Sequence, residues 1–194
     1  MKKWVRDYLP TALAVLCLFA ARSSLADHYI VPSGSMEHTL VPGDRVIVDK
    51  HAYGWRVPFT LIKLNAGTVP ARGDVVVFDS PVDGTRLIKR VVAVAHDVVE
   101  VRGGHVWING KSLATAPGDT EHFDGRRATL NLSFGGGRDI GPTRVPPGEV
   151  LVLGDARGNS HDGRYFGFVS ANAIYAKAVR VYYRRGQGVT WLPL

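Results

Sequence analysis

The stretch that decides the fold class is Arg72-Gly73-Asp74-Val75-Val76-Val77-Phe78, together with Arg86-Leu87-Ile88-Lys89-Arg90-Val91-Val92-Ala93-Val94. Each is a short run rich in β-branched and apolar residues. Gly73-Asp74 precedes the first run, Asp79-Ser80-Pro81 ends it, and Asp83-Gly84 precedes the second. Short apolar runs bounded by Gly, Pro and Asp are typical of buried strands. The two segments therefore predict a fold built on buried β-strands.

The same pattern recurs on both sides of these segments. Further strands are expected at residues 44–48, 98–101, 106–108, 150–153 and 176–183. Asn109-Gly110 is a strong hairpin signal. The chain between Lys111 and Pro147 is rich in Gly, Asp and Arg, which predicts a looser excursion. Because the sequence shows neither an internal repeat nor a long amphipathic helix, the expected fold class is mostly β.

The composition indicates one folded domain. The chain has 194 residues, of which 45% are hydrophobic and 21% are charged. Its net charge is +7, but the basic residues are scattered and not interleaved with aromatics, so nucleic acid is not an expected partner. An anionic membrane surface and a solvated basic surface both remain compatible with this charge. The single cysteine, Cys17, excludes an intramolecular disulfide and a cysteine-based metal site.

The N-terminus carries an apolar stretch that has two interpretations. Residues 8–21 are uncharged and follow Lys2, Lys3 and Arg6. This length is short of the roughly 20 residues that cross a bilayer, and residues 24–26 resemble a signal-peptide cleavage pattern. If Arg22 snorkels, however, residues 8–26 suffice for a thin span. In both cases the basic residues predict a cytoplasmic N-terminus and an external domain.

Two hydroxyls follow this stretch in Pro32-Ser33-Gly34-Ser35-Met36. In an extended segment Ser33 and Ser35 lie on one face, and Gly34 lets backbone or substrate approach closely. Ser35 is then a candidate nucleophile, and the Ser33 hydroxyl and the Ser35 N–H are candidate donors to an oxyanion. An ordinary polar turn is the alternative.

A serine nucleophile needs a base within hydrogen-bond reach. His161 lies between Ser160 and Asp162, but neighbours in an extended segment point to opposite faces. The chain also lacks a Gly-x-Ser-x-Gly elbow. A Ser/His/Asp triad is therefore disfavoured.

Lysine is the other candidate base. Period-two alternation puts Lys89 on one face of its strand and Arg90 on the other, so one of the two cations must face apolar neighbours. Burial there lowers the pKa of a lysine and favours the neutral amine. The alternative is an edge strand from which both cations reach water.

A third segment, residues 154–164, is dense in hydrogen-bonding groups and reads Gly154-Asp155-Ala156-Arg157-Gly158-Asn159-Ser160-His161-Asp162-Gly163-Arg164. It can orient a base and tie strands together through Asp/Arg pairs. A solvated loop is the alternative.

In this order the segments resemble the bacterial type I signal peptidases, the Ser/Lys membrane peptidases that release secretory signal peptides. Residues 32–36 with Thr39-Leu40 are similar to the nucleophile box, and residues 88–92 to the box that holds the general base. Residues 43–48 and 72–78 resemble the strands between them, and residues 154–164 resemble the last box.

The resemblance implies a role for each matching residue. Ser35 matches the nucleophile and Lys89 the general base, while Ser33 matches the oxyanion-hole hydroxyl and Ser160 the serine that hydrogen-bonds the lysine. The charged residues that hold the site together match Arg90, Asp155, Arg157, Asp162 and Arg164.

The resemblance also implies an organisation and a set of partners. Residues 1–26 are expected to form a cytoplasmic N-terminus and one transmembrane anchor in the bacterial inner membrane. Residues 27–194 are expected to form an extracytoplasmic, antiparallel-sheet peptidase domain. The expected substrates are exported preproteins cut after small-x-small motifs. Membrane lipids are expected partners and nucleic acid is not. The protein is expected to be a monomer that needs no metal and no cofactor.

The sequence departs from the family pattern at several turns. Ala93-Val94-Ala95-His96-Asp97 stands where Gly-x-Pro-Gly-Asp is usual, and Ala156, Gly158 and Gly163 replace commoner Asn, Asp and Ser. Two other hypotheses remain open, a specialised relative serving a conjugation or pilus system and an inactive anchored domain that binds exported peptides or lipid. A self-cleaving repressor is disfavoured because the N-terminus lacks a DNA-reading helix pair.

Overall fold

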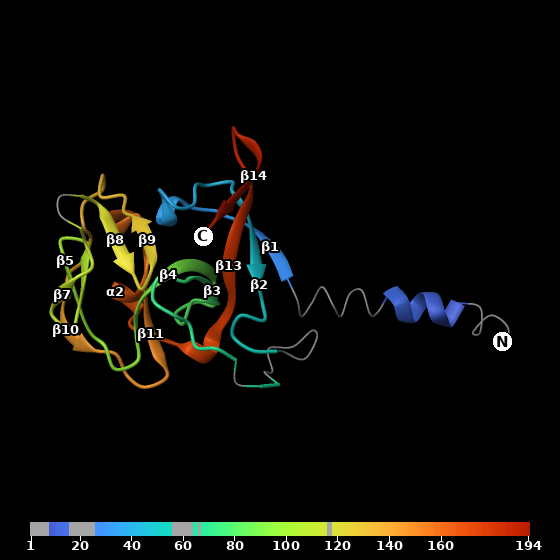
Figure 1. Cartoon of the computed structure of the whole chain (residues 1–194), viewed down its shortest axis with the longest axis horizontal. Coiled ribbons are helices and arrows are strands. Elements are labelled where there is room, and N and C mark those ends of the chain that lie inside the picture. Colours follow the sequence, from blue (N-terminus) through green and yellow to red (C-terminus); the bar gives the residue numbers. More distant parts are fainter. Residues whose placement is uncertain (1–7, 16–25, 56–63, 66, 116–117) are drawn as a thin grey trace.

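Strands dominate the protein (Figure 1). The structure, a computed structural model, describes residues 8–15, 26–55, 64–65, 67–115 and 118–194. Within these residues the main sheet contains β1 (Ala26–Ile30), β2 (Arg45–Asp49), β3 (Val75–Asp79), β4 (Arg86–Val94), β11 (Glu149–Leu153), β12 (Val169–Ser170), β13 (Ile174–Arg184) and β14 (Gly188–Pro193). The strand order is β1-β2-β13-β3-β4-β11-β12, and β14 pairs with β13.

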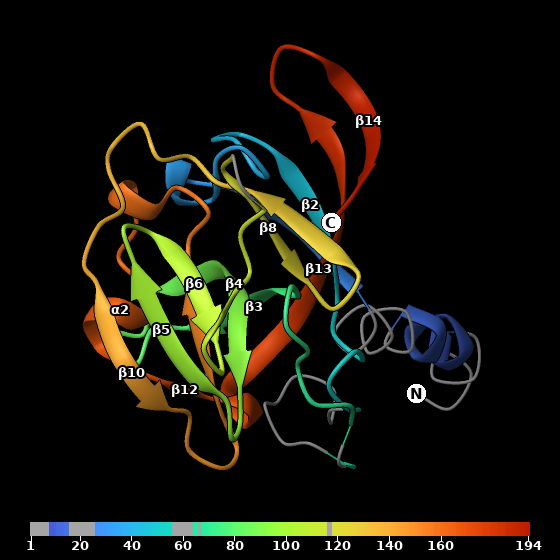
Figure 2. The ribbon, with the colours of Figure 1, turned by 60° about the vertical axis from the view of Figure 1, so that its left-hand side comes forward.

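A smaller sheet and a separate hairpin form a second lobe. The smaller sheet has the order β10-β5-β6-β7, and the hairpin pairs β8 with β9. In Figure 1 these strands lie on the left, and β1, β2 and β13 lie on the right. Figure 2 shows β5, β6 and β10 side by side, with the β13–β14 hairpin projecting at the top. The bounds are β5 (Val98–Arg102), β6 (His105–Ile108), β7 (Lys111–Ser112), β8 (Thr120–Phe123), β9 (Arg126–Thr129) and β10 (Ile140–Arg144).

Helical structure in the described residues is short. Besides the helical residues 8–15, the chain forms the 3₁₀ turns η1 (Gly34–Met36), η2 (Arg157–Asn159) and η3 (Ala171–Ala173), and the helix α2 (Gly163–Phe166). The predicted fold class, mostly β with antiparallel pairing, is confirmed. The expected strands correspond to β2, which begins one residue later than expected, and to β3, β4, β5, β6, β11 and β13, while the stretch from Lys111 to Pro147 holds four short strands, β7 to β10.

Much of the expected membrane anchor, residues 16–25, lies outside the described residues. Among the residues that are described, no helix has both the length and the apolar character needed to cross a membrane.

The valine run of β3 is continuous because both faces of this strand are buried. Val75 and Val77 pack into a core with Val46 and Ala176, while Val76 and Phe78 pack on the opposite side of the sheet. A strand covered on both faces needs no polar alternation. This places the β3–β4 pair at the centre of the molecule.

Strand β4 is paired on both sides for only part of its length. Residues 86–90 pair with β3, whereas the register with β11 covers residues 90–94. Within the described structure, residues 86–89 therefore leave one backbone edge of β4 unpaired. This unpaired edge ends at Lys89.

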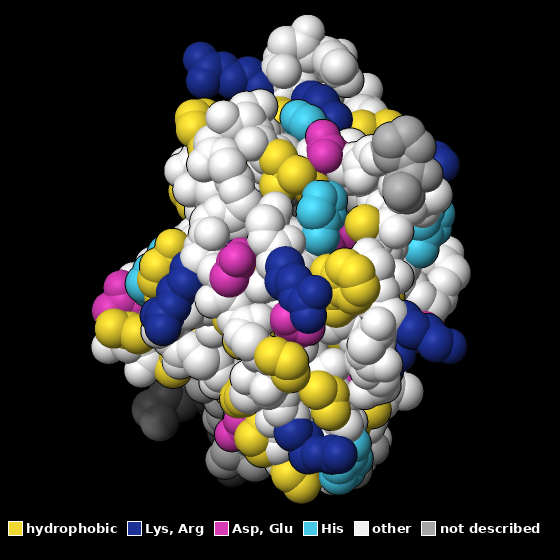
Figure 3. Space-filling model, turned by 90° about the vertical axis from the view of Figure 1, so that its left-hand side faces the viewer, with side chains coloured by type: hydrophobic (Ala, Val, Ile, Leu, Met, Phe, Trp, Pro, Cys, Tyr) yellow, Lys and Arg dark blue, Asp and Glu magenta, His cyan; other side chains and the backbone are white. Residues whose placement is uncertain are grey.

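The surface of the second lobe carries mixed charge. On the face in Figure 3, Lys and Arg side chains are scattered among acidic and apolar ones and do not form one continuous patch.

Candidate active site

Ser35 lies in a tight turn that follows β1. The expectation that residues 33–35 are extended is wrong, because residues 34–36 form the 3₁₀ turn η1, and only Ser33 before it has extended backbone angles. Burial of Met36 and Leu40 anchors this turn in the core. The two hydroxyls still meet, since Ser33 Oγ donates to Ser35 Oγ at 3.4 Å.

Lys89 reaches Ser35 from β4. Its Nζ donates to Ser35 Oγ at 2.5 Å across 54 residues of sequence, and its side chain is only 3% exposed. Burial lowers the pKa of Lys89 to about 8, although the charges of Asp162 and Asp155 act in the opposite direction. A large share of this amine is therefore neutral slightly above neutral pH, as a general base requires.

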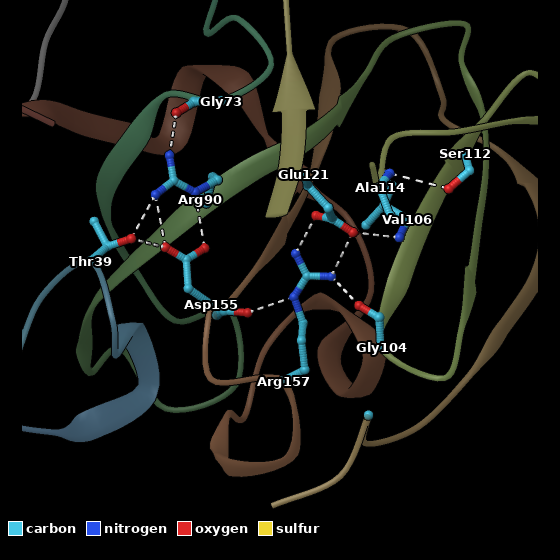
Figure 4. Close-up of polar contacts among 12 residues, drawn as sticks. Thr39, Gly73, Arg90, Gly104, Val106, Ser112, Ala114, Glu121, Asp155 and Arg157 are labelled. Carbon is cyan, nitrogen blue, oxygen red and sulfur yellow. Dashed lines mark hydrogen bonds and ion pairs between the residues drawn. The ribbon is translucent and has the colours of Figure 1, made fainter. Parts of the chain in front are cut away.

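The neighbouring cation is buried as well. Arg90 is 3% exposed, and its guanidinium donates to Asp155 through Nε at 2.9 Å and Nη2 at 2.8 Å, and through Nη1 to Gly73 O at 2.8 Å (Figure 4). Thr39 Oγ1 donates to the same carboxylate at 2.5 Å. The sequence predicted that one of these two cations faces the interior, and the structure buries both. The alternative, an edge strand from which both cations reach water, is wrong. A buried cation persists here because it is fully paired.

Residues 154–164 form a packed scaffold, so the solvated-loop alternative is wrong. Ala156 N–H donates to Ser35 O at 3.1 Å. Asp162 accepts from Gly154 N at 2.9 Å and from Arg164 Nε at 2.8 Å. Gly154 itself is required, because a Cβ at that position would overlap Ser35 O and the Ser160 hydroxyl.

Arg157 extends this scaffold into the second lobe. It is fully buried and pairs through Nη2 with Glu121 Oε2 at 2.7 Å, and it also donates to Gly104 O (Figure 4). Sequence reasoning missed Glu121, which lies on β8 in the stretch expected to be loose. A buried arginine needs a carboxylate partner. This requirement could have indicated that an acidic residue such as Glu121 pairs with Arg157.

The structure treats the two neighbours Ser160 and His161 differently. Ser160 Oγ is buried and lies beside the Asp162 carboxylate, and its bond to Lys89 stays a prediction. His161 is exposed and stacks on Tyr165 with a centroid separation of 5.2 Å. Its ring is therefore turned to the surface and does not serve Ser35.

A cavity of about 420 Å³ opens beside Ser35 and Lys89. Ser33 also lines it, and Tyr29, Thr85 and Arg86 line it as further polar groups. Sequence reasoning did not identify this cavity, because its walls come from β1, β2, β3 and β4, which only the fold brings together. Its apolar lining consists mainly of Ile30, Val31, Val46, Val77, Leu87 and Ile88.

The site offers a hydroxyl and an amine in contact, a second hydroxyl, and an apolar groove. No group of three or more His, Cys, Asp or Glu side chains in the described part of the chain is placed to hold a metal ion.

The model of the family "Signal peptidase, peptidase S26" matches residues 1–183 of this chain. The chain belongs to this family. It is thus a serine endopeptidase of the signal peptidase I type, as the resemblance implied.

Two relatives matched by sequence agree with this assignment. The chain is 33% identical over 182 residues to the probable signal peptidase I-2 of Synechocystis, with 90% of this chain and 71% of the relative covered. It is 34% identical over 177 residues to the signal peptidase I of Pseudomonas fluorescens, covering 83% of this chain and 61% of that relative. A crystal structure of a signal peptidase I from Enterococcus faecalis aligns with a TM-score of 0.39 and 28% identity, covering 63% of this chain and 97% of that one.

Proposed function

We propose that this peptidase removes signal peptides from exported preproteins, with Ser35 as the nucleophile and Lys89 as the general base. The observation that carries this proposal is the 2.5 Å contact between Lys89 Nζ and Ser35 Oγ. It joins a buried amine of lowered pKa to a hydroxyl on the wall of an apolar cavity. A neutral amine at hydrogen-bond distance is what a serine nucleophile needs for activation.

The reaction then proceeds in two stages. Neutral Lys89 takes the Oγ proton of Ser35 as that oxygen attacks the scissile carbonyl carbon. The Ser33 hydroxyl and the Ser35 N–H donate to the oxyanion. Protonated Lys89 gives its proton to the leaving amine, which leaves an ester on Ser35. Lys89 next deprotonates a water molecule that attacks this ester, and protonated Lys89 then returns that proton to Ser35 Oγ as the acid product leaves.

The groove favours an extended peptide with small side chains. The unpaired edge of residues 86–89 can accept main-chain hydrogen bonds from a substrate strand lying along it. The walls beside Ser35 are apolar and the volume is about 420 Å³, which suits alanine-sized side chains on alternate substrate residues. This is the basis for cleavage after small-x-small motifs.

The charged residues of the site have a positioning role in this proposal. Arg90 with Asp155, Arg164 with Asp162, and Arg157 hold β4 and residues 154–164 against the turn that carries Ser35. The Ser160 hydroxyl is buried beside Asp162, and it is assigned the role of accepting a hydrogen bond from Lys89 during turnover.

The proposed topology is a single-pass protein of the bacterial inner membrane. Residues 1–26 anchor it with the N-terminus in the cytoplasm, residues 27–194 lie outside, and the protein acts as a monomer in contact with lipid. The basic residues ahead of the apolar stretch support this orientation. Since Ser35 follows Ala26 by only nine residues, the nucleophile lies near the membrane surface. Tethering there raises the effective concentration of a membrane-borne substrate.

The test is to incubate the detergent-solubilised chain with a preprotein and to measure the masses of the product ends. Cleavage at one site after a small-x-small motif is expected. Ser35→Ala and Lys89→Ala are expected to abolish it while the β fold, checked by circular dichroism, is retained. Ser112→Ala and Lys111→Ala, at exposed positions on β7, are the matched controls. Substantial turnover by Ser35→Ala, or binding without turnover by the unmodified chain, contradicts the proposal.

A further inference from the structure

Glu37 follows Ser35 by two residues, and the reaction assigns it no role. Its backbone N–H donates to Gly34 O at 3.1 Å and closes the turn η1. Its side chain folds back over the same residue, because a Cβ on Gly34 would lie only 2.8 Å from Glu37 Oε1. The main chain and the side chain of Glu37 therefore both pack against Gly34.

The peptide unit between Gly34 and Ser35 carries the Ser35 N–H, one of the two groups assigned to the oxyanion. In a trans peptide the C=O and the N–H point in opposite directions. The hydrogen bond that Gly34 O accepts from Glu37 N thus also sets the direction of the Ser35 N–H. An oxyanion donor accelerates the reaction only when it is aimed in advance at the place where the charge develops.

Asn131, in the segment after β9, holds the side chain of Glu37. It is buried at 6% exposure, and its Nδ2 donates to Glu37 Oε2 at 3.2 Å. The orientation of this amide is defined, because its Oδ1 accepts from Ser133 N at 3.0 Å and its NH₂ group is left to face Glu37. The main chain of Asn131 is held as well, since it donates to Asp155 O at 2.9 Å and accepts from Arg157 N at 3.1 Å.

Gly34 serves this arrangement through its missing side chain and not through its backbone angles. It is not among the glycines with a positive φ, so its backbone conformation is open to alanine as well. The Cβ of an alanine would take the space of the Glu37 carboxylate. The flexible end of Glu37 is then expected to move away and to lose its hydrogen bond with Asn131.

We propose that Glu37 is a positioning residue, held in place by Asn131, that keeps the Ser35 N–H aimed at the oxyanion. The inference rests on the proposed function and adds a residue that acts through Ser35 and not on the substrate. Glu37 is absent from the described residues that line the cavity. Its loss is therefore expected to lower kcat and to leave KM nearly unchanged.

The main test reverses the direction of the hydrogen bond between Glu37 and Asn131. Glu37→Gln keeps an acceptor for Asn131 Nδ2 and is expected to retain about half of kcat or more. Asn131→Asp keeps the acceptor for Ser133 N but places two carboxylates together, and it is expected to lower kcat about tenfold or more. In the combined variant the new amide donates to the new carboxylate, so kcat is expected to return to within about threefold of the unmodified enzyme.

Glu37→Ala and Gly34→Ala remove the same contact by different routes. Each is expected to lower kcat about tenfold to hundredfold with less than about a twofold change in KM. Because both act on one contact, the double variant is expected to be no slower than the slower single variant. The matched controls are Gly141→Ala, where a Cβ meets nothing within 4 Å, and Glu100→Ala on β5. Both controls are expected to keep kcat, and urea unfolding shows which variants are folded.

Three results would overturn the inference and leave the proposed function intact. The first is an unchanged kcat in folded Glu37→Ala and Gly34→Ala. The second is an equal loss of kcat in Glu37→Gln and Glu37→Ala, which would show that the charge acts and not the hydrogen bond. The third is a combined variant as slow as Asn131→Asp alone, and this comparison decides the matter if the alanine variants do not fold.

The pH profile separates an effect on Ser35 from an effect on the base. The charges that act on Lys89 are those of Asp162, Asp155 and Arg164, so Glu37→Ala is expected to keep the midpoint near pH 8 and to lower only the plateau. A displaced midpoint would overturn the inference, because Glu37 would then act on the amine. If the unmodified enzyme cleaves no preprotein, the proposed function has failed, and the inference fails with it.

Discussion

At the scale of single residues, the chemistry depends on which of two opposing effects controls Lys89. Asp162 and Asp155 favour the protonated amine, whereas burial at 3% exposure disfavours it. Burial is the larger effect, and the pKa falls from 10.5 to about 8. Arg90, one residue later, is equally buried but stays charged, because a guanidinium does not lose its proton in a protein. The two hydrogen bonds that Asp155 accepts from Arg90 make the burial of this charge tolerable. Adjacent residues thus supply a base that can be neutral and a structural cation.

The first prediction concerns the pH dependence of cleavage. Only neutral Lys89 accepts the Ser35 proton, so kcat/KM is expected to rise about tenfold per pH unit below the pKa of about 8 and to level off above it. At pH 7 it is expected to be about one tenth of its plateau. The measurement is kcat/KM for one preprotein from pH 6 to 10, with His161→Ala as the control. A midpoint near 6.5 that His161→Ala removes would instead identify a histidine base.

The second prediction is that Lys89→Met makes the protein more stable while inactivating it. The pKa of Lys89 is about 8 in the folded chain, against the ordinary value of 10.5 that applies to the unfolded chain. Between these values the unfolded chain binds the extra proton, so the stability of the unmodified protein rises with pH across this window. Below pH 8 the penalty is complete. Lys89→Met is therefore expected to gain about 3 kcal/mol at pH 7.

Urea unfolding at pH 7 and at pH 10.5 measures this difference. The advantage of Lys89→Met is expected to shrink at the higher pH, and Lys111→Met on the exposed strand β7 is expected to show no such trend. Equal or lower stability of Lys89→Met at pH 7 would contradict the lowered pKa.

At the scale of elements, the sequence predicts a strand well where both faces of that strand are buried. The valine runs of β3 and β4 were recognisable because both of their faces are covered. Strand β1, Ala26–Ile30, carries Asp27 and His28 and, among the described strands, pairs with β2 alone, so it lacks that pattern. For Ser35 the sequence left both an extended segment and a turn open, because burial of Met36 and the hydrogen bond from Ala156 determine the shape of the 3₁₀ turn that forms. Both are tertiary contacts that local propensity does not contain.

The third prediction concerns the buried ion pair between Arg90 on β4 and Asp155. Asp155→Ala leaves the guanidinium of Arg90 buried without its carboxylate, and it is expected to cost about 3–5 kcal/mol. Asp124→Ala is the matched control, because Asp124 is 63% exposed and its partner Arg72 keeps a second carboxylate, Asp97. That variant is expected to cost about 1 kcal/mol or less. Equal losses for both variants in urea unfolding would mean that Arg90 finds water when Asp155 is removed.

At the scale of the whole molecule, one guanidinium connects the second lobe to the catalytic turn. Arg157 contacts Glu121 on β8 and Gly104 between β5 and β6. Its own backbone N–H donates to Asn131 O. The preceding residue, Ala156, donates to Ser35 O. The resemblance named Arg157 as a structural residue, but its partner was not predictable, since the contact with Glu121 spans 36 residues and joins the turn η2 to the β8–β9 hairpin.

The last prediction is that Arg157 and Glu121 are energetically coupled. Arg157→Leu and Glu121→Leu each leave one buried charge unpaired and are each expected to cost about 3–5 kcal/mol. The double variant removes both charges, so its loss is expected to be several kcal/mol smaller than the sum of the two. The pair Arg102 and Glu100 on β5, in which the Arg102 side chain is exposed, is the control, and its double-mutant cycle is expected to show little or no coupling.

Activity in the same variants shows whether this link reaches the site. Losing Arg157 frees residues 156–159 to shift, and the hydrogen bond from Ala156 to Ser35 O shifts with them. Cleavage is therefore expected to fall in Arg157→Leu and to stay low in the double variant even where its stability recovers. If activity recovers together with stability, Arg157 serves the fold alone and has no part in positioning Ser35.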